Sequence, residues 1–229
     1  MKICGLQKVT LLDFPNHVAC TVFLGGCNYN CPFCYNSGLI GASGYEFMSD
    51  DDFFSFLDKR HGILDGVAIT GGEPLVHPEI FEFIKKIKEK GFKVKLDTNG
   101  SFPKALKELL EAGLVDYVAM DIKNSYDKYL MTIDANIDLN LIRESIGLLL
   151  KGDVDYEFRT TVVRQFHDVA DFEKIGEMIK GAKRYYLQSY QAKDSVRRKD
   201  LTPLSKEELQ LCLDRVKDAV CSASLREID

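Results

Sequence analysis

The chain has 229 residues, of which 45% are hydrophobic and 28% are charged, the composition of an ordinary folded domain with a sizeable core. Its net charge of −5 argues against a nucleic-acid-binding protein, and its densest basic run, Arg197-Arg198-Lys199, is typical of a solvated loop. Charged residues interrupt the N-terminal segment, which argues against a signal peptide, and no apolar run approaches membrane-spanning length. The seven cysteines are an odd count, which argues against a disulfide framework. We therefore expect a cytoplasmic protein without membrane partners.

Six apolar segments of strand length alternate with six segments whose apolar residues have helical spacing. The predicted strands are residues 18–24, 67–70, 93–96, 115–120, 156–163 and 185–190. The predicted helices are residues 49–57, 78–87, 106–110, 139–149, 171–180 and 205–220. Ser49 is a suitable N-cap for the first helix, and Ser205 with Glu208 forms a capping box at the start of the last.

This alternation predicts parallel βαβ units with right-handed crossovers, in either an open doubly wound sheet or a curved barrel. No domain boundary is visible. We therefore expect one domain over residues 1–229, with its core at about 17–190, a connection at 191–204 and a C-terminal helical extension at 203–222. Polar residues follow the predicted strands at the edge where barrel active sites are built, namely Cys27, Glu73, Asp97, Asp121 and Gln191.

Three cysteines follow the first predicted strand at the spacing C-x₃-C-x₂-C: Cys27, Cys31 and Cys34. They lie on a loop with glycine and proline at its turns, which is a poor design for a buried core. Cysteine is the usual ligand of iron–sulfur clusters, and three thiolates on a 4Fe–4S cluster would leave one iron open to another ligand. A structural zinc site is the alternative, with a histidine as fourth ligand. The candidate histidines are His17, His61 and His77.

A second motif, Gly71-Gly72-Glu73-Pro74, follows the next predicted strand. The pairing of CNYNCPFC with GGEP resembles the radical S-adenosylmethionine (SAM) superfamily. The opening from Gly5-Leu6-Gln7 through Leu12-Asp13-Phe14-Pro15 is similar to the activating proteins of anaerobic ribonucleoside-triphosphate reductases, relatives of the pyruvate formate-lyase activase. The resemblance covers most of the chain and is strongest over residues 3–36, 65–76 and 94–124.

The resemblance implies a partial (β/α)6 TIM-like barrel and an oxidoreductase with a 4Fe–4S cluster and SAM as cofactors. Such an enzyme cleaves SAM reductively to methionine and a 5′-deoxyadenosyl radical, which abstracts hydrogen from a glycine of a partner glycyl-radical enzyme. The implied partners are anaerobic ribonucleotide reductase and a flavodoxin- or ferredoxin-type electron donor. No Arg-Val-x-Gly-Tyr segment occurs in the chain, so we expect the target glycine on another protein.

The same resemblance assigns roles to individual residues. Cys27, Cys31 and Cys34 would hold the cluster, and Phe33 would lie against the adenine, unless it serves only to pack the loop. The implied cofactor-binding residues are Gly71, Gly72, Glu73, Asp97, Asn99, Asp121, Lys123 and Arg159. Glycines let backbone carbonyls approach the SAM ammonium group, and the Glu73 carboxylate would add charge. The alternative interpretation is that this motif only forms a turn.

Asp97 and Asp121 each follow a buried strand, and adjacent carboxylates repel unless a cation lies between them. The resemblance implies a monovalent cation there, completed by Thr98 and the Ala119 carbonyl; capping of the next segment is the alternative. Lys123 would neutralise a substrate carboxylate. Arg159 lies inside a strand and needs a partner, either a cofactor, Glu73 or a structural salt bridge.

Two positions depart from the family pattern: Tyr35 stands where many reductase activators have histidine, and Gln191 where the formate-lyase activase has one. Cys4 and Cys20 have no predicted role, and Cys212 and Cys221 are expected on opposite faces of one helix. Two other functions stay open: a radical SAM enzyme acting on a small molecule, similar to 7-carboxy-7-deazaguanine synthase, and a non-enzymatic iron–sulfur or zinc protein.

Overall fold

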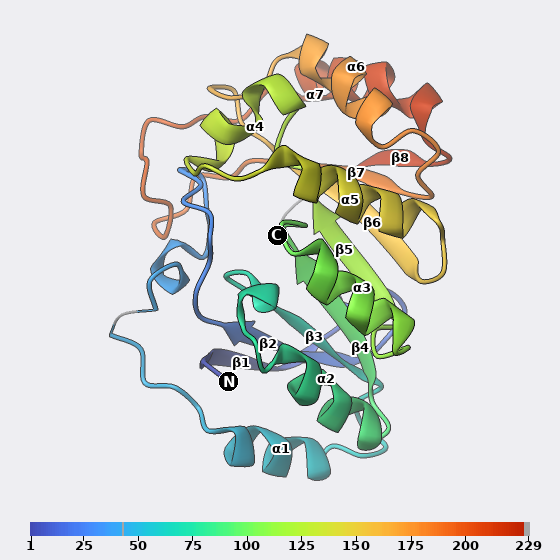
Figure 1. The fold of residues 1–229 in the computed structure, drawn as a ribbon. Coiled ribbons are helices and arrows are strands. Elements are labelled where there is room, and N and C mark those ends of the chain that lie inside the picture. Colours follow the sequence, from blue (N-terminus) through green and yellow to red (C-terminus); the bar gives the residue numbers. More distant parts are fainter. Residues whose placement is uncertain (43, 227–229) are drawn as a thin grey trace. The chain divides into compact units, whose positions relative to one another are not determined.

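The computed structural model describes residues 1–42 and 44–226 (Figure 1). Its strands are β1 (Ile3–Thr10), β2 (Ala19–Leu24), β3 (Gly66–Gly71), β4 (Lys93–Thr98), β5 (Tyr117–Asp121), β6 (Asp155–Val162), β7 (Tyr185–Ser189) and β8 (Ala223–Arg226). They form one open sheet in chain order. β1 is antiparallel to β2, and the pairs β2–β3, β3–β4, β6–β7 and β7–β8 are parallel. The fold is therefore a mostly parallel α/β sheet.

Helices connect the strands. They are α1 (Asp50–Asp58), α2 (Ile80–Glu89), α3 (Pro103–Glu111), α4 (Tyr126–Ile133), α5 (Leu139–Leu150), α6 (Val169–Met178) and α7 (Lys206–Val216), with short 3₁₀ turns at Ser37–Leu39, Pro74–Val76 and Lys217–Ala219. The N-caps of the first and last helices are confirmed, since Ser49 accepts from the Asp52 N–H and Ser205 forms the capping box with Glu208.

The six strands predicted from the sequence are confirmed as β2 to β7, but β1, β8 and α4 were not predicted. β1 is an edge strand whose middle, from Gly5 to Val9, is half-buried or exposed, so it lacks the apolar run of a central strand. β8 has four residues and lies at the other edge of the sheet. Edge strands need only one partner and carry a weak hydrophobic signal.

The chain divides into two compact units. The first contains residues 1–28, 38–98 and 104–118. In it, α2 packs on β4, and Phe53 of α1 stacks on Phe83 of α2 with ring centroids 5.3 Å apart. The second contains residues 29–37, 99–103 and the chain from Ala119 onward. There α6 and α7 lie side by side, and α7 packs on β7 and β8 (Figure 1).

The predicted C-terminal helix is wrong at its end. α7 stops at Val216, and Val220 is extended at φ −127° and ψ 161°. Val220 is an apolar, buried residue at a position that fits the helical spacing. However, it belongs to the extended segment that leads into β8 and not to the helix. Cys212 is buried in α7 and Cys221 is exposed outside it, so the expectation of opposite faces of one helix is also wrong.

β8 is attached to the sheet by a buried ion pair as well as by its strand pairing. Arg226 of β8 makes two hydrogen bonds to Glu157 of β6, at 2.7 Å and 3.0 Å, and Glu157 is only 1% exposed. The guanidinium also lies over the Tyr186 ring, 3.6 Å from its centroid. Removing the arginine would leave a carboxylate buried without this charge partner.

We predict that Arg226→Leu lowers the free energy of unfolding in urea by about 2 kcal/mol, because the Glu157 charge stays buried. Replacing both residues by Leu should restore most of the loss. Arg198→Leu is the matched control, since its partner Asp200 is exposed. The explanation would be wrong if Arg226→Leu cost no more than this control.

Candidate functional site

The cysteine loop starts at the end of β2 and is shared by the two units: Cys27 belongs to the first, and Cys31 and Cys34 to the second. In the first unit, the Gly26 N–H donates to the Leu39 carbonyl at 2.7 Å and the Cys27 N–H to the Ile40 carbonyl at 3.3 Å. Gly26 has φ +99°, a conformation that favours glycine. Backbone hydrogen bonds therefore help to fix the start of the loop.

The glycine motif after β3 lies directly against this start of the loop. The Gly72 N–H donates to the Leu24 carbonyl and the Glu73 N–H to the Gly26 carbonyl, both at 2.8 Å. A Cβ on Gly72 would lie 2.0 Å from the Gly26 carbonyl oxygen, and Gly71 has φ +119°. Side chains at these two positions would push the backbones apart, so the structure brings together the two motifs that the sequence analysis paired.

Glu73 is buried and its carboxylate already has protein partners. Its Oε1 atom accepts hydrogen bonds from the Leu75 N–H at 3.1 Å and from the Thr98 hydroxyl at 2.8 Å. Glu73 thus caps the 3₁₀ turn at Pro74–Val76, as the turn reading predicts. The resemblance placed Thr98 at a bound cation; in the structure its hydroxyl donates a hydrogen bond to Glu73. The role of Glu73 toward the SAM ammonium group stays a prediction.

In the second unit, Asn30 holds the backbone next to Cys31 in three ways. Its N–H donates to the Ile133 carbonyl at 3.0 Å, its side-chain amide to Asp134 at 2.7 Å, and its carbonyl accepts from the Arg197 guanidinium at 2.7 Å. The Cys34 N–H then donates to the Cys31 carbonyl at 3.2 Å, which closes the turn between these two cysteines. Arg197, interpreted from the sequence as part of a solvated loop, therefore supports the cysteine loop.

The two positions that depart from the family pattern contact each other. The Gln191 N–H donates to the Tyr35 hydroxyl at 2.8 Å, and the Tyr35 ring stacks on Tyr190 with centroids 6.1 Å apart. Phe33 is 4% exposed and packs against Phe166 at 5.6 Å, so it takes part in loop packing. Tyr35 thus attaches the end of the cysteine loop to the segment after β7, and Phe33 packs on the segment after β6.

Asp121, at the end of β5, pairs with both predicted cationic residues. Arg159 Nε lies 2.9 Å from one carboxylate oxygen, and Lys123 Nζ lies 2.9 Å from the other. Burial alone would raise the pKa of Asp121, but the charges of Arg159 and Lys123 outweigh it and lower the pKa to about 2. Burial would lower the pKa of Lys123, and the Asp121 carboxylate outweighs it and raises that pKa. All three side chains are therefore charged at neutral pH.

These pairs bear on the predicted cation site. Asp97 in the first unit pairs with the buried Lys95, and Asp121 has its two cations. Each carboxylate thus has a protein counter-charge within its own unit, so neither needs a bound cation for neutralisation, and the cation site stays a prediction. Asn99 accepts hydrogen bonds from the Ser101 N–H and hydroxyl, at 2.9 Å and 2.6 Å, as a turn residue does.

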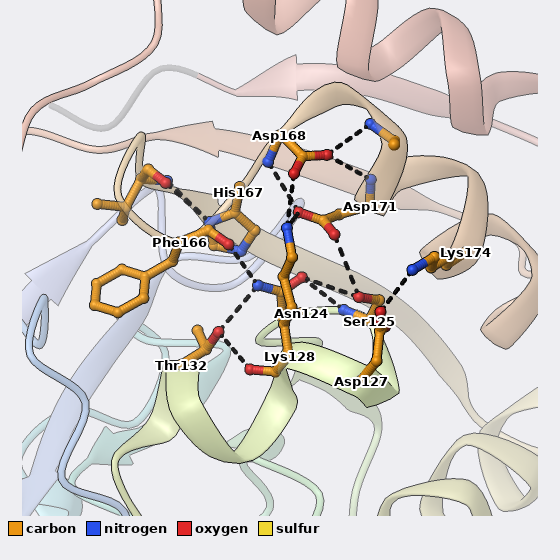
Figure 2. A network of polar contacts seen from close by, with 12 residues as sticks. Asn124, Ser125, Asp127, Lys128, Thr132, Phe166, His167, Asp168, Asp171 and Lys174 are labelled. Atoms are coloured by element: carbon orange, nitrogen blue, oxygen red, sulfur yellow. Dashed lines mark hydrogen bonds and ion pairs between the residues drawn. The ribbon is translucent and has the colours of Figure 1, made fainter.

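A buried polar network fixes the turn that carries Lys123, and Figure 2 shows its members around Asn124. The fully buried Asn124 amide donates to the Thr132 hydroxyl and to the Phe166 carbonyl, each at 2.9 Å. His167 Nε2 lies 2.8 Å from the Lys123 carbonyl, so this nitrogen carries the proton and donates. His167 Nδ1 then accepts from the Val163 N–H at 3.1 Å. The network was not predicted, because Asn and His in loops carry no periodic signal.

The three candidate histidine ligands have other contacts. His17 Nδ1 lies 2.7 Å from the Pro15 carbonyl, His77 Nε2 lies 2.8 Å from the Gly25 carbonyl, and His61 stacks on Phe92. None of the seven cysteines, all of which lie in the described residues, forms a disulfide. Within residues 1–42 and 44–226, no three His, Cys, Asp or Glu side chains are grouped around the position of a single metal ion. The same residues include no helix long and apolar enough to cross a bilayer.

Comparison with known proteins identifies the family. The model of the Radical SAM superfamily matches residues 21–179, which include the cysteine loop and the glycine motif. The chain belongs to the radical SAM superfamily. Its cofactors are therefore a 4Fe–4S cluster and SAM, as the resemblance implied.

Individual relatives agree with this assignment. The chain is 34% identical over 203 residues to a Methanocaldococcus jannaschii protein named as a putative glycyl-radical enzyme activating enzyme, covering 84% of this chain and 81% of the relative. A second protein of that organism with the same description is 26% identical over 178 residues, covering 76% of this chain and 63% of the relative.

Solved structures match the fold of this radical SAM chain. A domain of a pyruvate-formate lyase-activating enzyme from Bacteroides vulgatus has a TM-score of 0.58 at 21% identity, covering 70% of this chain and 98% of that one. Streptococcus suis SuiB bound to SAM has a TM-score of 0.69 at 12% identity, covering 88% and 48%. At these identities the likeness concerns the fold.

The donor set fits a 4Fe–4S cluster better than a single metal ion. Each thiolate of such a cluster binds a different iron, so Cys27, Cys31 and Cys34 do not need to converge on one point, as zinc ligands do. The absence of a single-ion grouping in the described residues is therefore compatible with the cluster. If the three thiols of this loop are the ligands, as the resemblance implies, they would supply soft donors and leave one iron without a protein ligand.

The buried His167 predicts a pH dependence of stability. Burial lowers its pKa from the ordinary value of 6.5, so the unfolded state binds more protons below that pH. The free energy of unfolding of the metal-free protein should therefore decrease as the pH falls from about 6.5 toward the lowered pKa, because protonation would remove the acceptor for Val163.

Urea unfolding at pH 7.5 and at pH 5.8 would measure this effect. His167→Gln keeps a donor for the Lys123 carbonyl but does not titrate. We expect its free energy of unfolding to fall much less between pH 7.5 and pH 5.8 than that of the parent. The control His61→Gln changes an exposed histidine and should keep the decrease of the parent. Equal pH dependence in the two variants would show that His167 is not the cause.

Proposed function

We propose that this chain is a radical SAM activase that abstracts a hydrogen atom from a glycine of a separate glycyl-radical enzyme. The observation that carries the proposal is the 34% identity to a relative named as such an activating enzyme, which extends over most of both chains. The partner we propose is an anaerobic ribonucleotide reductase, since residues 3–36 resemble its activators. A flavodoxin- or ferredoxin-type protein would supply the electron.

In this proposal Cys27, Cys31 and Cys34 hold the cluster. The cofactors, once bound and reduced, supply the 5′-deoxyadenosyl radical. The protein holds the loop by the backbone contacts at Gly26 and Asn30, and none of the three cysteines is in a disulfide. Cys31 is 7% exposed, which limits access of water to that end of the loop.

Gly71, Gly72 and Glu73 are proposed to bind the SAM ammonium group. The support is the contact of this motif with Gly26, which is adjacent to the ligand Cys27. Lys123 and Arg159 are proposed to face the SAM carboxylate. Their support is the buried pair with Asp121, because two cations on one carboxylate leave a net positive charge that suits a second carboxylate.

Mixing tests the proposal directly. The reduced protein, SAM and a glycyl-radical enzyme of the same organism are combined without oxygen, and electron paramagnetic resonance is recorded. We expect a glycyl doublet and stoichiometric 5′-deoxyadenosine, because the glycine Cα radical is stabilised by its flanking amides. Cys31→Ala should give neither, since it removes a cluster ligand. Turnover of a small metabolite without a doublet from any of that organism's glycyl-radical enzymes would favour the small-molecule alternative.

The carboxylate role predicts a defect in SAM binding. Lys123→Met and Arg159→Met should each weaken binding by about 1.5–3 kcal/mol, roughly a tenfold to hundredfold higher dissociation constant, since each removes a charged hydrogen bond. The absorption spectrum of the cluster should not change. Titration of the reconstituted protein with SAM measures both.

Lys128→Met is the matched control, because Lys128 is another lysine of the second unit that forms ion pairs, in its case with Asp168 and Asp171. It should bind SAM as the parent does. Parent-like affinity in the Lys123 and Arg159 variants would show that these two residues serve the structure alone.

A further inference from the structure

A buried hydroxyl in the second unit makes no hydrogen bond. Tyr129 of α4 is fully buried, and its hydroxyl oxygen has no hydrogen-bond partner among the described residues. Buried polar groups are nearly always hydrogen-bonded, because water no longer satisfies them. An unpaired hydroxyl in a buried position is therefore evidence for a partner that binds there.

The surroundings of Tyr129 indicate where that partner lies. The ionisable groups that act on its phenol are Lys123, Cys31 and Asp121, and the hydroxyl lies near the Lys123 backbone without forming a hydrogen bond to it. A tyrosine phenol is protonated at neutral pH, so the hydroxyl is a hydrogen-bond donor. The phenol thus lies within electrostatic reach of Cys31 and of the Asp121 ion pair.

α4 is also attached to the cysteine loop by its backbone. Tyr129 lies one helical turn before Ile133, so both residues are on the same face of α4. The Ile133 carbonyl accepts from the Asn30 N–H at 3.0 Å, and Asp134 accepts from the Asn30 side chain at 2.7 Å. Asn30 is adjacent to Cys31, so the C-terminal end of α4, one turn after Tyr129, lies against the chain at Cys31.

We propose that Tyr129 donates a hydrogen bond to the sulfur of Cys31 when the cluster is bound. The proposal rests on the ligand role of Cys31 in the proposed function. A thiolate on iron is an acceptor for a phenol, and hydrogen bonds to cluster sulfurs set the reduction potential. The bond stabilises the reduced cluster more than the oxidised one, because the reduced form carries more negative charge. Tyr129 is thus a positioning and tuning residue that makes the cluster easier to reduce.

Tyr129→Phe and the control Tyr185→Phe test this inference. Both residues are fully buried, but the Tyr185 hydroxyl donates to Thr160 at 2.6 Å. In the metal-free protein, Tyr129→Phe should unfold at the same or a higher urea concentration than the parent, because it removes an unpaired hydroxyl. Tyr185→Phe should unfold at a lower concentration.

In the reconstituted protein, the midpoint potential of the cluster is measured by an anaerobic redox titration. Tyr129→Phe should shift it to more negative values, while Tyr185→Phe leaves it unchanged and both bind SAM as the parent does. An unchanged potential in Tyr129→Phe, a lower stability of its metal-free form, or weaker SAM binding without a shift in potential would each overturn the proposal. These measurements use no partner protein, so they test the role of Tyr129 even if the chain fails to activate a glycyl-radical enzyme.

Discussion

The backbone next to Cys31 is held by hydrogen bonds from two distant parts of the second unit, and the proposed cluster site depends on this attachment. Asn30 connects the loop to the end of α4 through Ile133 and Asp134, and to the segment after β7 through Arg197. Without such contacts a loop of this composition would lose much conformational entropy on binding a cluster. The protein thus orders part of the ligand loop before any cofactor binds.

Charge is arranged around the same loop. Burial raises the pKa of the Cys34 thiol, and the charges of Lys123 and Arg197 oppose part of this rise. Positive groups near a thiol favour its deprotonated form, which is the form that binds iron. The Asn124 and His167 network behind Lys123 keeps its backbone in place, since Asn124 and His167 bridge the turns after β5 and β6. These buried polar groups therefore fix the backbone that carries the Lys123 charge.

Periodicity and motif spacing predicted the part of the fold that depends on buried apolar runs. β2 to β7 and the capped helices α1 and α7 follow from such runs, whereas β1 and β8 are edge strands with a weak apolar signal. The end of the last helix was predicted wrongly because Val220 is buried from an extended segment. The cysteines and the glycine motif could be found because their chemistry demands fixed spacing. Arg197, Tyr129 and His167 could not, since each acts across a large distance in sequence.

The charge argument for Asp97 and Asp121 shows another limit of the sequence. Two carboxylates at strand ends suggested a bound cation, but the compensating charges come from Lys95, Lys123 and Arg159. Lys95 and Lys123 are each two residues from their partners, so this possibility could be seen in the sequence. Arg159 and Asp121 lie on the neighbouring strands β6 and β5, so their pairing could be predicted only if the strand order were known.

The central claim is that three thiolates hold a 4Fe–4S cluster with one iron open to SAM. Mössbauer spectroscopy with iron and sulfide analysis of the anaerobically reconstituted protein tests it most directly. The account predicts about four irons and four sulfides per chain, with one iron whose signal changes when SAM is added. Stoichiometric zinc without iron, or a cluster in which no iron responds to SAM, would contradict it.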